Sequence, residues 1–150
     1  MFNLEAVTKM YGREYQHDAL APACMAAWRV IAEEILAVCN PVKTVLDVGS
    51  GPGALCSIFS SRGISALGVD GSTEAVALDF HPVIAWDLRT PFTASKPVDL
   101  VTCFDTAEHI EEEYANALVD TLVKNVRQGG ELLFGPAPEG QDGHGHVNLQ

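Results

Sequence analysis

The residues best suited to chemistry in this chain are glycines and acids that follow a short apolar segment. Asp47-Val48-Gly49-Ser50-Gly51-Pro52-Gly53 places three glycines within five residues, at the end of the apolar stretch Thr44–Val48. Glycines at such a turn let the backbone approach a ligand closely, and a helix that begins there offers unpaired N–H groups. An ordinary connection between a strand and a helix rarely needs three glycines. The segment therefore predicts a binding site for a small-molecule cofactor.

Two classes of cofactor fit this glycine segment. Gly49-x-Gly51-x-x-Ala54 satisfies the dinucleotide fingerprint in its G/A form, and Asp70 lies about twenty residues further on, where that fingerprint places an acid. The spacing D-x-G-x-G-x-G is instead similar to motif I of the class I S-adenosylmethionine (SAM)-dependent methyltransferases. The segment alone leaves both classes open.

The elements expected around these residues alternate between strands and helices. We expect strands at 44–48, 64–69, 83–86, 98–104 and 131–134, and helices at 22–39, 54–62, 72–78 and 111–126. This alternation predicts an α/β fold with a doubly wound, mostly parallel sheet of about five strands, whose ligands gather at the carboxyl ends of the strands. One domain is expected over residues 1–150, with an N-terminal helical cap at 1–41 and a Rossmann-like core at 42–150.

The remainder of the chain favours the methyltransferase resemblance, which covers residues 43–148. Gly68-Val69-Asp70 and Trp86-Asp87-Leu88 resemble the ends of the family's second and third strands, the stretch 99–110 resembles its fourth strand and the following loop, and 129–133 resembles the turn into its fifth strand. The resemblance implies that SAM is the cofactor. It also implies which residues hold it: Asp47, Gly49, Ser50, Gly51 and Gly53 at the amino-acid end of the donor, Asp70 with Gly71 at the ribose, Asp87 with Leu88 at the adenine, and Asp105 beside them.

Asp105-Thr106-Ala107-Glu108-His109 follows the fourth strand and has three possible roles. The favoured role is to order the loop and the cofactor. The second is catalysis on the acceptor side, with His109 as the general base and Glu108 beside it. The third resembles the small-RNA 2′-O-methyltransferases, in which E-x-x-E-H and a later histidine bind a divalent metal; the ligands would be Asp105, Glu108, His109 and either His144 or His146. Because E-x-x-E-H also occurs in metal-free small-molecule methyltransferases of this class, and because the first acid here is Asp rather than Glu, we predict no metal ligand.

The net charge and composition of the chain limit the classes of partner that it is expected to bind. Nine Lys and Arg residues stand against 20 Asp and Glu, which gives a net charge of −11. Such a chain repels phosphate backbones and anionic lipid, so a small-molecule acceptor is expected rather than nucleic acid. The sequence has no apolar stretch that predicts a signal peptide or a membrane helix, and a cytoplasmic location is expected. The four cysteines, Cys24, Cys39, Cys56 and Cys103, lie in apolar segments and are expected to be buried free thiols.

These observations predict a SAM-dependent methyltransferase that acts on a small acceptor. The family usually continues with a further helix and an antiparallel hairpin, so either a minimal fold or a second copy covering the sheet edge is expected. Three alternatives stay open: a protein that binds the cofactor without turnover, a metal-assisted enzyme like the RNA 2′-O-methyltransferases, and, least favoured, a nicotinamide-dependent oxidoreductase.

Overall fold

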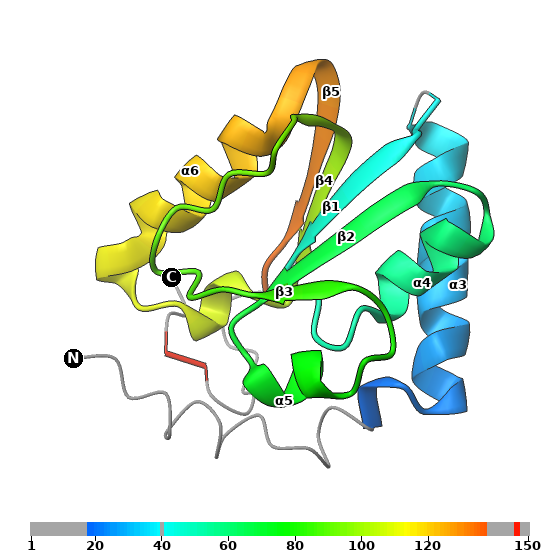
Figure 1. Ribbon diagram of the computed structural model, residues 1–150, viewed down its shortest axis with the longest axis horizontal. Coiled ribbons are helices and arrows are strands. Elements are labelled where there is room, and N and C mark those ends of the chain that lie inside the picture. Colours follow the sequence, from blue (N-terminus) through cyan, green and yellow to red (C-terminus); the bar gives the residue numbers. More distant parts are fainter. Residues whose placement is uncertain (1–17, 40, 138–145, 148–150) are drawn as a thin grey trace.

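A five-stranded parallel sheet forms the centre of the molecule. The computed structural model describes residues 18–39, 41–137 and 146–147 (Figure 1). Its strands are β1 (Thr44–Val48), β2 (Ser65–Asp70), β3 (Val83–Ala85), β4 (Val98–Phe104) and β5 (Val126–Gly135). They lie in the order β3-β2-β1-β4-β5, and every neighbouring pair is parallel. The predicted doubly wound α/β fold is confirmed, and the switch in strand order falls between β1 and β4.

Helices cover both faces of this sheet. They are α3 (Pro22–Val38), α4 (Ala54–Ser61), α5 (Thr73–Ala77) and α6 (Ala115–Asn125), with single 3-10 turns η1 (Ala107–His109) and η2 (Glu112–Tyr114). In Figure 1, α3 and α4 lie on one side of the sheet and α6 on the other. Alternation along β1 supplies both layers, because Val45 packs with the α3–α4 cluster while Leu46 and Val48 pack with the α6 cluster. The glycine loop between β1 and α4 is therefore fixed by two buried cores.

Local signals in the sequence explain where several elements begin and end. The Ser72 hydroxyl accepts a hydrogen bond from Ala75 N and caps α5. Pro22 occupies the first turn of α3, where a missing N–H costs nothing. Gly63 follows α4 with a φ of +77°, the left-handed conformation that glycine adopts without strain. These three signals confirm the expected bounds to within a residue or two.

The region after β4 differs from the expected continuous helix at 111–126. Glu111 is extended, η2 forms a single turn, and α6 begins only at Ala115, so the three glutamates 111–113 lie outside its first turn. The helix ends at Asn125, whose buried side chain bonds Phe92 O and Ala94 N. The helix is therefore four residues shorter at its N-terminal end than its apolar period predicts, and one residue shorter at its C-terminal end.

The fifth strand is longer than expected and contains an irregularity. Val126 already pairs with Val98, and the register shifts before Leu100 pairs with Glu131. The segment 128–130, which precedes the strand expected at 131–134, therefore lies within β5. Gly130 is required there, because a Cβ would meet Asp99 O at 2.8 Å.

Burial also corrects two expectations about apolar residues. The apolar period of α3 predicts one buried stripe made of Met25, Trp28, Ile31, Ile35 and Val38. Ile35 is buried, together with Ala32, whereas Ile31 and Val38 are 37% and 74% exposed. Among the cysteines, Cys56 and Cys103 are buried as expected, Cys39 is half-buried and Cys24 is exposed. Leu36 also packs against the core, beside Met25 and Trp28 of the predicted stripe, so the buried face of the helix differs from the predicted one.

Two further predictions concern the surroundings of the domain. β5 lies at one end of the strand order, and a second copy of the chain over this edge stays a prediction. Among the helices of the described residues, none combines the length and apolar character needed to cross a membrane. The first 17 residues of the predicted cap at 1–41 lie outside the described part of the chain.

Candidate active site

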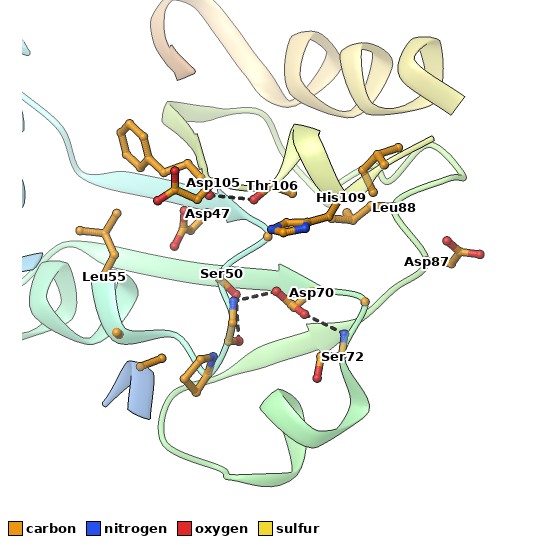
Figure 2. A pocket seen from close by; sticks show the side chains of 18 of the residues that line it. Asp47, Ser50, Leu55, Asp70, Ser72, Asp87, Leu88, Asp105, Thr106 and His109 are labelled. Atoms are coloured by element: carbon orange, nitrogen blue, oxygen red, sulfur yellow. Dashed lines mark hydrogen bonds between the residues drawn. The ribbon is translucent and has the colours of Figure 1, made fainter. Parts of the chain in front are cut away.

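A cavity of about 380 Å³ opens at the carboxyl ends of β1, β2 and β4 (Figure 2). Of the predicted site residues, Asp47, Gly49, Ser50 and Gly51 line it from β1 and the glycine loop, and Asp70, Gly71, Asp87, Leu88, Asp105 and His109 line it from the other strand ends. Gly53 and Glu108 are not among the residues that line it. The sequence did not predict that Cys24 and Trp28 of α3 also line the cavity; an apolar helix period gives no such signal.

The glycine loop has a conformation that only glycine accepts without strain. Gly49 has a φ of +76°, and a Cβ built there would meet the Thr106 hydroxyl at 2.0 Å. Gly51 has a φ of +54°. Gly53 caps α4 with a φ of +86°, and its Cβ would meet the Cβ of His81 at 2.8 Å. The first two glycines thus shape the cavity, while the third sets the start of the helix.

Asp70 is the acid that holds the glycine loop. Its two carboxylate oxygens accept hydrogen bonds from Gly51 N and Ser72 N, both at 2.7 Å, and Figure 2 shows it between these two segments. Desolvation raises the pKa of Asp70, and the two backbone bonds and the nearby His109 oppose this rise. Asp70 therefore ties β2 to the loop and keeps carboxylate lone pairs available to the cavity.

Asp47 is buried at the end of β1. Its carboxylate accepts a hydrogen bond from the Thr102 hydroxyl at 2.7 Å, and the Cys56 thiol lies 3.9 Å from its other oxygen. Desolvation raises its pKa to about 7; the Thr102 bond lowers the pKa and the Asp70 charge raises it further. A cation that enters the cavity would favour the ionised form of this buried carboxyl and so lower its pKa.

Asp87 is held by an arginine that sequence reasoning missed. The Arg89 guanidinium bonds both Asp87 oxygens, with Nε–Oδ1 at 2.9 Å and Nη2–Oδ2 at 3.0 Å. Arg89 also lies 3.8 Å from a Glu111 oxygen and 5.6 Å from the centre of the Tyr114 ring. The two-pronged bond from Arg89 fixes the Asp87 carboxylate beside buried Leu88. Through Glu111 and Tyr114, Arg89 also connects Asp87 to the chain before α6.

Asp105 follows β4 in an unusual backbone conformation. Its φ is +46°, and its N–H donates to Gly135 O of β5 at 2.9 Å. Desolvation and the Glu108 carboxylate raise its pKa, while His109 and His146 lower it. Asp is one of the non-glycine residues that adopt this left-handed conformation readily, and in it Asp105 lines the cavity at the end of the strand.

Glu108 and His109 lie on η1, one turn beyond Asp105. The His109 ring is directed into the cavity (Figure 2). Glu108 is 2% exposed, and neither of its carboxylate oxygens has a hydrogen-bond partner among the described residues. Ligand atoms of Glu108, His109 and His146 lie within 4.8 Å of one another, and Asp105 is not part of this group. His144, the other histidine named for this loop, lies outside the described residues.

Comparison with solved structures identifies the class of the fold. The chain is similar to DesVI from Streptomyces venezuelae, with a TM-score of 0.68 and 16% identity over 93% of this chain and 60% of that one. It is also similar to CalS10, a SAM-bound amino pentose methyltransferase from Micromonospora echinaspora, with a TM-score of 0.65 and 24% identity over 93% of this chain and 58% of that one. The fold is the Rossmann-like fold of methyltransferases.

Sequence comparison then gives the family. A family model described as a methyltransferase domain matches residues 15–135, which is more than half of the chain. The chain belongs to this family of class I SAM-dependent methyltransferase domains, and the predicted resemblance is confirmed.

Relatives with curated names agree with this family. The ubiquinone biosynthesis O-methyltransferase of Paraburkholderia xenovorans (strain LB400) is 33% identical over 106 residues, which cover 61% of this chain and 43% of the relative. The enzyme of the same name from Nitrosomonas europaea is 28% identical over 104 residues, with the same coverage. The match spans less than half the length of these relatives.

Proposed function

We propose that this chain binds SAM in the cavity and transfers its methyl group to a small-molecule acceptor. The observation that carries the proposal is the arrangement of Asp70 and the glycine loop, in which a carboxylate at the end of β2 is bonded to a loop that only glycine can form. The cavity of about 380 Å³ suits a cofactor of this size, since ligand pockets commonly measure about 300–1,000 Å³. Family membership supports SAM as the ligand.

The residues of the cavity fit the three parts of the cofactor. Asp47, Gly49, Ser50 and Gly51 would surround its amino-acid end, with Gly53 holding the loop in place. Asp70, beside Gly71, would accept hydrogen bonds from the ribose hydroxyls. Asp87, fixed by Arg89, would face the adenine amino group, with Leu88 packed against the ring and Asp105 nearby. When bound, SAM supplies a methyl carbon on a positively charged sulfur, and the surrounding carboxylates favour that charge.

His109 is the residue we place on the acceptor side, with Glu108 behind it. His109 lines the cavity from the loop after β4, opposite the glycine loop. The chain's contribution to transfer is to hold the acceptor in line with the methyl group and to exclude water. The apolar residues Trp28 and Phe104, whose rings lie 6.2 Å apart, border the same cavity, and they would shield an acceptor from solvent.

The class of acceptor follows from charge and from the relatives. A net charge of −11 disfavours nucleic acid and anionic lipid. By their names, the similar proteins methylate intermediates of ubiquinone biosynthesis or an amino pentose. We infer a small organic acceptor for this chain as well.

Calorimetric titration with SAM, with NAD as a control, tests the proposal. Micromolar binding of SAM alone corresponds to about −8 kcal/mol. Replacing Asp70 with Asn should weaken SAM binding about 100-fold, because two charge-assisted hydrogen bonds are lost at about 1.5 kcal/mol each. Asp79→Asn is the matched control: Asp79 is exposed, and Asn tolerates its φ of +48°. Equal affinity in the two variants, or binding of NAD instead, would contradict the proposed site.

Turnover is tested separately from binding. His109→Ala should abolish methyl transfer to any accepted small molecule while changing SAM affinity by less than about threefold. Loss of SAM binding to the same extent as loss of turnover would instead place His109 on the donor side.

A further inference from the structure

Three side chains with metal-ligating atoms gather beside the cavity. Glu108 and His109 come from η1, and His146 comes from the chain after β5. One ligand atom from each lies within 4.8 Å of the other two. His109 also lines the cofactor cavity, so this cluster adjoins the space that we assign to the acceptor.

Glu108 is the member of the cluster that needs an explanation. It is 2% exposed, and both carboxylate oxygens lack a hydrogen-bond partner among the described residues. Removing a carboxylate from water without hydrogen bonds is costly, so buried carboxylates are normally paired or bound to a metal. Two other acids of this protein follow that rule, because Asp99 and Asp70 accept two or more hydrogen bonds each. The two carboxylate oxygens of Glu108 are therefore available to a ligand that the described residues do not themselves supply.

Backbone hydrogen bonds fix the segments that carry the two histidines near this carboxylate. Val147 N donates to Glu108 O at 2.8 Å, which fixes His146 against η1. His109 N donates to Thr106 O at 3.0 Å and closes the turn. The His109 and His146 rings lie with their centres 5.0 Å apart and their planes at 70°. Two imidazoles from segments far apart in sequence thus meet at one buried carboxylate.

We propose that Glu108, His109 and His146 bind one divalent first-row metal ion, such as Zn²⁺. Two imidazoles and one carboxylate are a common set for such an ion, and they leave a coordination position open. Metal–ligand bonds of about 2.1 Å place ligand atoms roughly 3.4 Å apart in a tetrahedral site. Binding would therefore require side-chain rotation that brings ligand atoms now up to 4.8 Å apart closer together.

The role of this ion rests on the proposed methyltransferase function, to which it would add a preference for one kind of acceptor. It would lie at the edge of the cavity from which the acceptor approaches, with its open position available to an oxygen of the acceptor. A hydroxyl next to a divalent ion loses its proton to solvent more readily. The ion would therefore favour acceptors that are methylated on oxygen, and His109 would act as a ligand rather than as a free base.

Cobalt titration of protein prepared without a histidine tag tests the site directly. Co²⁺ bound by two imidazoles and a carboxylate gives visible absorption bands, so binding is read without any enzyme assay. We expect one ion per chain. Glu108→Gln and His146→Ala should each weaken binding at least about 100-fold, since even changes outside the ligand set commonly weaken it 10- to 100-fold. His144→Ala, two residues from His146, is the matched control and should bind Co²⁺ like the wild type.

Thermal unfolding with and without Zn²⁺ separates loss of the site from loss of the fold. Glu108→Gln removes a buried charge while keeping the shape, so without metal its midpoint should equal or exceed that of the wild type. Zn²⁺ should raise the midpoint of the wild type and of His144→Ala but not of Glu108→Gln. Co²⁺ binding by Glu108→Gln at wild-type affinity, or loss of binding in His144→Ala instead of His146→Ala, would overturn the ligand set.

SAM calorimetry on the same preparations keeps the two proposals distinguishable. Binding of SAM without any binding of Co²⁺ or Zn²⁺ would overturn the metal site and leave the methyltransferase proposal in place. Binding of the ions without SAM would support the metal site and overturn the cofactor assignment.

Discussion

The acids at the two ends of the sheet differ in how they are hydrogen-bonded and in the direction in which their pKa values are shifted. At the amino end, Asp99 of β4 accepts hydrogen bonds from Lys43 N at 2.8 Å and Thr44 N at 2.9 Å, and it bonds the Arg127 side chain at 2.6 Å. These bonds hold the pKa of Asp99 well below its usual range, and the Arg127 bond is the largest cause. At the carboxyl end, desolvation instead raises the pKa of Asp47, and Glu108 accepts no hydrogen bond from the described residues.

This contrast separates acids that stabilise the fold from acids that await a ligand. A carboxylate whose oxygens all accept hydrogen bonds within the protein lowers the free energy of the native state. A desolvated carboxylate that lacks hydrogen bonds raises the free energy of the native state unless a cation or a hydrogen-bond donor binds to it. Proteins keep such groups mainly at functional sites. The amino end of the sheet should therefore govern stability, and the carboxyl end should govern binding.

The largest effect on stability is expected from Asp99→Ala. Removal of the carboxylate leaves two backbone N–H groups and Thr44 without their acceptor, which should lower the free energy of unfolding by about 2–3 kcal/mol. Urea denaturation measures this change. Asp120→Ala, which removes only an exposed i, i+4 partner of Lys124, should cost about 0.5 kcal/mol or less. SAM affinity of the folded Asp99→Ala protein should equal that of the wild type; a large drop would break the proposed separation between the two ends.

The next effect in size is a pH dependence of binding that comes from Asp47. Its pKa is about 7 in the folded protein and near 3.8 in the unfolded chain. Its protonated form stabilises the fold fully below about pH 4, and this contribution is lost as the pH rises through 7. Binding of a positively charged donor has the opposite sign, because it requires the ionised form.

Calorimetry at several pH values measures this second effect. SAM affinity should fall about tenfold for each unit below pH 7 and should level off above it. In the region of the transition, binding should release a proton, which is visible as a dependence of the heat on the buffer. Asp47→Asn should remove both the slope and the proton release. An unchanged slope in that variant would assign the titration to another group.

Sequence reasoning located the carboxyl end well because its signals are local. The glycine loop, Asp70 and the Ser72 cap all follow from patterns within a few residues, and the alternation of strands predicted the sheet that brings them together. The hydrogen bond from Gly51 N to Asp70, nineteen positions apart, is a direct consequence of the parallel pairing of β1 and β2.

Features that depend on distant packing were not accessible in this way. Thr106 touches the position of a Gly49 Cβ across 57 positions, and nothing in either segment indicates the other. The irregularity in β5 depends on Asp99 facing Gly130. His146 meets Glu108 only because the chain after β5 returns to η1, so the sequence offered Asp105 as an equal candidate, and the structure separates it from the cluster.

The smallest effect is expected at Arg89, which bonds the Asp87 carboxylate and also lines the cavity. Arg89→Lys keeps the charge but removes the two-pronged bond to the carboxylate, so SAM affinity should fall about three- to tenfold. Adenosine affinity should fall by the same factor, because the defect lies at the adenine end of the cavity. Arg62→Lys, whose partner Glu33 lies outside the cavity lining, should change neither affinity.

A double-mutant cycle with Asp87→Asn decides whether Arg89 acts through Asp87. If it does, Arg89→Lys should have almost no further effect on SAM affinity in the Asp87→Asn background. Additive losses would mean that Arg89 affects binding through Glu111 and Tyr114 instead. In that case the adenine side of the cavity would depend on the chain before α6, and Asp87 would belong with Asp99 among the acids that serve the fold.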